Sequence, residues 1–147
     1  MTFDQLRERL QSHGAHALDG ASEEDIQQAE AKLGVVFAGS YRQFLKEFGW
    51  ADVGHLELYG LGREVPPYLD LVKVTLSERS EMEPPLPTRL VPVMNDGGGN
   101  LYCLDLRNEQ IAEPPVVFWD HTRGRNQEPD QVAASFTKWM LKELESL

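Results

Sequence analysis

The sequence contains one cysteine, Cys103, among 147 residues. A single cysteine cannot form an intramolecular disulfide, and it excludes zinc sites that are built from several cysteines. Basic residues are also few, with 14 lysines and arginines against 24 aspartates and glutamates, so the net charge is −10. Because this charge repels phosphates, the composition argues against nucleic acid as a partner and favours a basic one.

No apolar run approaches the length that crosses a membrane, and the charged residues 1–10 do not resemble a signal peptide. We therefore expect a soluble, cytoplasmic protein without a membrane partner. Hydrophobic residues make up 41% of the sequence and charged residues 26%, a balance that suits one compact domain. Residues 1–147 are accordingly expected to form a single domain.

The stretch 90–106 predicts a β-hairpin around which the rest of the chain packs. Apolar runs at 90–94 and 101–104 flank a turn that contains three consecutive glycines. Glycines supply the positive φ angles that a tight reversal needs. Both pleat faces of the second arm are mostly apolar, which is typical of a strand near the centre of a sheet.

Three helices are predicted before this hairpin. Their N-caps are expected at Thr2, Ser22 and Ser40, and Gly34 and Gly49 are expected to end the second and third helices. Apolar residues at helical spacing follow each cap.

The remaining segments are less regular. Alternation over 50–62 predicts one strand that ends in a glycine turn, whereas 63–86 fits neither period well apart from a helical stretch at 77–83. A further strand is predicted at 116–120. A last helix is expected to begin at Pro129, with its apolar face formed by Val132, Phe136, Trp139, Met140 and Leu144.

Known ligand motifs do not fit the glycine run at 97–99. It lacks the spacing of a dinucleotide loop and the lysine of a P-loop, and it leads into a strand. The nearby oxygen donors lack the alternating spacing and closing glutamate of a calcium loop. We therefore expect no cofactor and no bound metal.

Asp120 and His121, together with Asp96, are the candidates for catalysis. Adjacent strand residues point to opposite faces, so Asp120 cannot simply orient His121, and the predicted burial of Cys103 makes its thiol inert. An enzyme would need Asp96 and His121 within hydrogen-bond reach in a deep pocket. We expect that the protein is not an enzyme.

Several motifs occur in an order typical of a known family. The most specific is Asn-Asp-Gly-Gly-Gly-Asn-Leu-Tyr-Cys-Leu-Asp at 95–105; the others lie at 41–45, 48–51, 58–62, 115–121 and 132–139. Over residues 22–144 the chain thereby resembles the SUKH superfamily, bacterial immunity proteins that share a domain with a yeast cell-wall-synthesis regulator. Ala38 departs from the proline that is usual in this family.

The resemblance implies an α+β fold, with a twisted, mostly antiparallel β-sheet flanked by about four helices, and no catalytic residues or cofactor. It implies an immunity protein that neutralises a cognate polymorphic or contact-dependent toxin by occlusion. Many such toxins are basic nucleases, which agrees with the charge of −10. The alternatives are a regulatory protein-interaction domain without a toxin partner and, less favoured, a small hydrolase.

The expected partner-binding surface combines three loops. Carboxylates would supply its charge, and an exposed Trp50 or His121 would anchor the partner. The residues assigned to it are Trp50, Asp52, His55, Glu57, Asp96, Asn100, Asp120 and His121.

Overall fold

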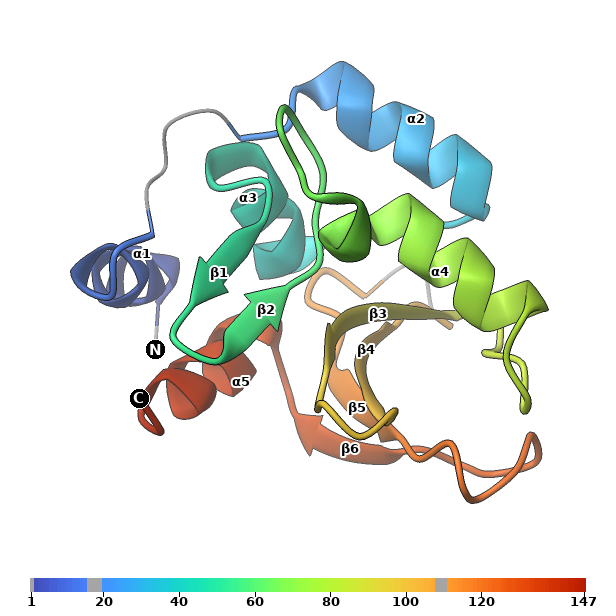
Figure 1. Ribbon diagram of the computed structural model, residues 1–147. Helices are drawn as coiled ribbons and strands as arrows, with labels where there is room; N and C mark the ends of the chain where they lie inside the picture. Colours follow the sequence, from blue (N-terminus) through green and yellow to red (C-terminus); the bar gives the residue numbers. More distant parts are fainter. Residues whose placement is uncertain (1, 16–19, 108–110) are drawn as a thin grey trace.

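The computed structural model describes residues 2–15, 20–107 and 111–147 (Figure 1). Its elements in chain order are α1 (Phe3–Ser12), α2 (Glu23–Leu33), α3 (Gly39–Glu47), β1 (Ala51–Val53), β2 (Leu56–Leu58), the 3-10 turn η1 (Pro67–Leu69), α4 (Leu71–Ser80), β3 (Leu90–Asn95), β4 (Leu101–Asp105), β5 (Val116–Trp119), β6 (Asp130–Ala133) and α5 (Phe136–Leu144). The predicted α+β class is confirmed, with a two-stranded and a four-stranded antiparallel sheet.

The hairpin at 90–106 is confirmed, and its second arm lies inside the larger sheet. The strand order is β3-β4-β5-β6, so β4 has a neighbour on each edge. One face of β4 contributes Leu104 to the main core, and the other contributes Leu101 and Cys103 to a second apolar cluster with Trp119. Cys103 is fully buried, as predicted, and burial raises its pKa.

The helices divide into two groups around these sheets. In Figure 1, α2 and α4 lie side by side above the four-stranded sheet, and α4 contacts β3. The other helices, α1, α3 and α5, gather near the two-stranded sheet. At the centre of the main core the buried Tyr41 hydroxyl donates a hydrogen bond to the Tyr59 carbonyl at 2.8 Å, while its ring packs against Phe44 and Phe136.

The helix caps agree with the sequence in two helices and differ in the third. Thr2 and Ser22 form capping boxes, and Gly34 ends α2 with a left-handed backbone. Ser40 does not cap α3, however, because that helix begins at Gly39 without a side-chain cap. Glu113 from a distant segment accepts the Ser40 amide at 2.9 Å instead.

Three strand and helix boundaries also differ from the sequence prediction. The expected strand over 50–62 is a hairpin, because Gly54 with φ +59° reverses the chain between β1 and β2. In the irregular region, α4 begins at Leu71, well before the helical stretch expected at 77–83. Pro129 does not start the last helix, since β6 follows it, Val132 is exposed on that strand, and Ser135 caps α5.

Candidate functional site

The β3–β4 turn is held by its own side chains. Asn95 Oδ1 accepts the amides of Gly97 and Gly99 at 2.8 and 3.3 Å. Asp96 Oδ1 accepts the Asn100 amide at 3.2 Å, and Asn100 Nδ2 donates to Asp96 Oδ2 at 3.0 Å. These bonds explain why aspartate, asparagine and glycine occur here, because such side chains replace missing backbone partners in tight turns.

Asn100 also joins this turn to the loop that follows β5. Its Oδ1 accepts the His121 amide at 3.2 Å and lies 2.7 Å from His121 Nδ1. The His121 ring covers Gly99, whose φ is +102°. Burial raises the pKa of Glu78 on α4, and the nearby His121 opposes that shift. The structure thus brings Asp96, Asn100 and His121 together through Asn100.

Replacing Gly99 with alanine should destabilise the protein by about 1–2 kcal/mol, because the backbone is left-handed there and a Cβ would lie 3.1 Å from the His121 ring. Gly97→Ala is the matched control, since Gly97 has φ +94° but open space around a Cβ. Urea unfolding should show the larger loss for Gly99→Ala. Equal losses would contradict close packing between the turn and His121.

Asp120 lies in the same loop, but its carboxylate accepts hydrogen bonds from within that loop. Asp120 Oδ1 accepts the Thr122 amide at 2.9 Å and the Thr122 hydroxyl at 2.6 Å. These hydrogen bonds lower the pKa of Asp120. The Gln127 side chain closes the loop, because it accepts a hydrogen bond from the Asp120 amide and donates one to the Asp120 carbonyl.

The β1–β2 hairpin carries the other four predicted site residues. Asp52 and Glu57 are cross-strand partners with exposed side chains, and neither has an ion pair within the described ranges. Like charges directly opposite each other in a sheet repel. His55 is exposed in the turn, whereas Trp50 is half-buried and packs against the main core.

Asp52→Asn should therefore stabilise the isolated protein by a few tenths of a kcal/mol, within the range of about 0.2–1 kcal/mol known for cross-strand pairs. The gain arises because the substitution removes the repulsion from Glu57. Urea unfolding at low salt checks it, and the gain should shrink in about 1 M salt, where charges are screened. A loss of stability would show that the two carboxylates do not repel each other.

The residues of the predicted surface belong to two turns. The turn of the β1–β2 hairpin lies beside the C-terminus, where a Cβ on Gly54 would meet the Leu147 side chain at 2.7 Å (Figure 1). The β3–β4 turn lies at the end of the larger sheet, and β2 contacts β3, where the Tyr59 amide donates to the Val93 carbonyl at 2.9 Å. We call the two sets of residues the hairpin patch (Trp50, Asp52, His55, Glu57) and the turn patch (Asp96, Asn100, Asp120, His121).

Comparison with known proteins identifies the family of this chain. The sequence model of the SMI1-KNR4 cell-wall family, SUKH_5, matches residues 1–145. The chain belongs to the SUKH family. This match confirms the resemblance drawn from the motif order and extends it over α1 as well.

Solved structures share the fold of this SUKH chain. One is the crystal structure of a protein from Pseudomonas syringae pv. tomato, with a TM-score of 0.72 and 18% sequence identity. The alignment covers 97% of this chain and 98% of that one. At this identity the likeness shows the fold alone. No curated protein matches the sequence.

The geometry expected of a small hydrolase differs from the geometry found. Asn100 stands between Asp96 and His121, and both of the latter side chains are exposed on surface loops. Within the part of the chain that the structure describes, no group of three or more histidine, cysteine, aspartate or glutamate side chains could hold a metal. Over the same residues, no helix is both long and apolar enough to span a bilayer.

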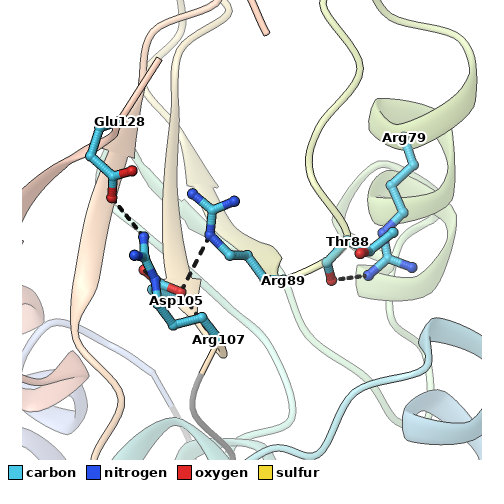
Figure 2. Close-up of polar contacts among 6 residues, drawn as sticks. All are labelled: Arg79, Thr88, Arg89, Asp105, Arg107 and Glu128. Atoms are coloured by element: carbon cyan, nitrogen blue, oxygen red, sulfur yellow. Dashed lines mark hydrogen bonds and ion pairs between the residues drawn. The ribbon is translucent and has the colours of Figure 1, made fainter. Parts of the chain in front are cut away.

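Sequence reasoning missed a charged network at the end of β4 in this SUKH chain (Figure 2). The buried Asp105 accepts a hydrogen bond from Arg107 Nε at 2.9 Å, and Arg89 Nε lies 3.8 Å from its other oxygen. Arg107 also donates to Glu128 at 2.7 Å, which links β4 to the segment before β6. Arg89 and Glu128 are distant in sequence from Asp105 and Arg107, so no local pattern could have revealed the whole network.

Proposed function

We propose that this chain is a cytoplasmic immunity protein that binds a cognate toxin, polymorphic or contact-dependent, and blocks it by occlusion. The toxin would be a basic protein, for example a nuclease, and the immunity protein would perform no catalysis of its own. The proposal rests on one observation above the others, the exposed carboxylates of Asp52 and Glu57 held opposite each other on the hairpin patch.

Two properties of this pair support binding to a basic surface. The carboxylates repel each other in the free protein, so a lysine or arginine placed between them would relieve that repulsion and gain two ion pairs. The turn patch differs, because Asp96 and Asp120 already accept hydrogen bonds from their own loops. We therefore place the main contact on the hairpin patch, with Trp50 as its apolar anchor.

Net charge supports the same partner. A charge of −10 steers a basic protein toward the chain and speeds encounter, although it does not by itself determine affinity. Affinity depends on a few well-packed residues, for which Trp50 beside the carboxylate pair is the best candidate in this patch.

The test is co-expression with the product of the neighbouring reading frame in a growth assay. A toxin encoded there should stop growth alone and permit it when the immunity protein is present. Asp52→Lys with Glu57→Lys should abolish rescue, whereas the control Glu8→Lys with Glu81→Lys should retain it. Those control residues are exposed acids on α1 and after α4. A neighbour that is not toxic would overturn immunity and favour the regulatory interaction domain.

A further inference from the structure

A groove of about 480 Å³ lies between α2 and α4, away from both acidic patches. Residues at successive turns of α2 form one wall, and the start of α4 with the loop at 61–65 forms the other. Its lining residues are Asp25, Gln28, Ala29, Lys32, Leu61, Gly62, Arg63, Val65, Asp70, Val72 and Lys73. Grooves of about 300–1,000 Å³ are the size that proteins use to bind ligands.

The groove collects positive charge that has no ion-pair partner among the described residues. Lys32, Arg63 and Lys73 all line it, and none of them forms an ion pair with another described residue. The two acids of the lining are already engaged. Asp25 accepts the Ser22 amide at 3.2 Å, and Asp70 accepts the Val72 and Lys73 amides at 3.0 and 3.2 Å, so each caps a helix.

Apolar side chains accompany these cations. Ala29, Leu61, Val65 and Val72 line the groove, and Leu76, which is 42% exposed, follows Val72 by one turn of α4. Residues four apart on a helix share a face, so Leu76 continues the face of Val72 along α4, beyond the residues that line the groove. A site with both apolar floor and free cations fits a peptide better than a lone inorganic anion.

The two helices are fastened together at the far end, which gives the groove a fixed width. The Arg79 guanidinium of α4 donates to the Leu33 carbonyl at the end of α2 at 2.8 Å. It also donates to the Thr88 carbonyl at 3.0 Å (Figure 2). Because these bonds exist without any partner protein, the groove needs little rearrangement to bind one.

We propose that the α2–α4 groove is a second docking site, which binds an acidic segment of a partner protein that presents an apolar side chain between its carboxylates. The site lies apart from the hairpin patch and attracts the opposite charge, so it does not depend on toxin binding. Repulsion from the rest of this acidic chain is weakened beyond about 8 Å at physiological salt, which leaves the three groove cations dominant at contact.

The experiment titrates the isotope-labelled chain with a short peptide that repeats Glu-Glu-Leu, and with a Lys-Lys-Leu peptide as the charge-reversed probe. Backbone NMR shifts should move along α2, α4 and 61–65 with the acidic peptide only. Lys32→Glu with Lys73→Glu should weaken binding about tenfold or more. Lys138→Glu with Lys142→Glu, two exposed lysines of α5, should leave it unchanged.

Lys32→Gln with Lys73→Gln is the second variant, because glutamate at the end of α2 could weaken that helix. It should also reduce binding while keeping the native spectrum. Several results would overturn the proposal: no binding of the acidic peptide, equal weakening by the α5 variant, or shifts confined to other elements. Self-association that the groove variants abolish would overturn it too, in favour of a second copy of this chain as occupant.

Discussion

Gly60→Ala is expected to destabilise the protein by about 3 kcal/mol or more, a large part of the about 5–15 kcal/mol that holds a typical domain together. A Cβ at this position would lie 1.7 Å from the Gly49 carbonyl oxygen. That distance is far inside van der Waals contact, so the backbone itself must move.

Hydrogen bonds on both sides resist such a movement. The Gly49 oxygen accepts the Leu61 amide at 2.9 Å, which closes the base of the β1–β2 hairpin. On its other side Gly60 donates to the Leu69 carbonyl at 2.9 Å and accepts the Leu71 amide at 2.8 Å. Separating the strands enough for a methyl group would break at least one of these bonds, and it would shift the hairpin patch relative to α4.

Chemical denaturation followed by circular dichroism measures the effect. Gly98→Ala is the control, because the nearest atom to a Cβ there is the Asp96 carboxylate at an ordinary 3.5 Å and its φ is not left-handed. That variant should change the unfolding free energy by less than about 0.5 kcal/mol. A Gly60→Ala protein as stable as Gly98→Ala would contradict the close approach of the two backbone segments.

The second large effect concerns binding. Asp52→Lys with Glu57→Lys should weaken the affinity for a basic toxin by about 100-fold or more, which corresponds to about 2.7 kcal/mol. The substitution replaces two attractive contacts with two repulsive ones at the proposed centre of the interface. The free protein should remain folded, because both side chains are exposed and their mutual repulsion is retained rather than increased.

Surface plasmon resonance or calorimetry gives the affinity, with Glu8→Lys and Glu81→Lys as the charge-matched control. Both double variants change net charge equally, so any long-range steering effect is common to them. The control should lose only part of its association rate. Equal weakening by the two variants would place the interface elsewhere. The hairpin patch would then contribute to binding only through the net charge of the protein.

Features that depend on residues close together in the chain could be predicted from the sequence. The capping boxes at Thr2 and Ser22 depend on residues three apart, and the glycine turn after β3 depends on six consecutive residues. The apolar faces of β4 could be predicted for the same reason, since strand periodicity is a local signal.

Contacts between segments that are distant in the chain could not be predicted from the sequence. Glu113 takes the role expected of Ser40 because it approaches α3 across a long sequence separation. The strand β6 was missed because it lies at a sheet edge with Asp130, Gln131 and Val132 all exposed, so its sequence does not alternate. The contact of β2 with β3 likewise depends on how the two sheets are placed, which no local pattern records.

The central claim is that this protein acts by binding another protein. Isothermal titration of the purified chain with the toxin domain that we propose is encoded beside it tests this most directly. We predict a one-to-one complex whose affinity falls as salt is raised, because opposite charges meet at the interface. Absence of binding to that toxin, or binding that is unchanged by both salt and the Asp52→Lys/Glu57→Lys substitution, would contradict the account.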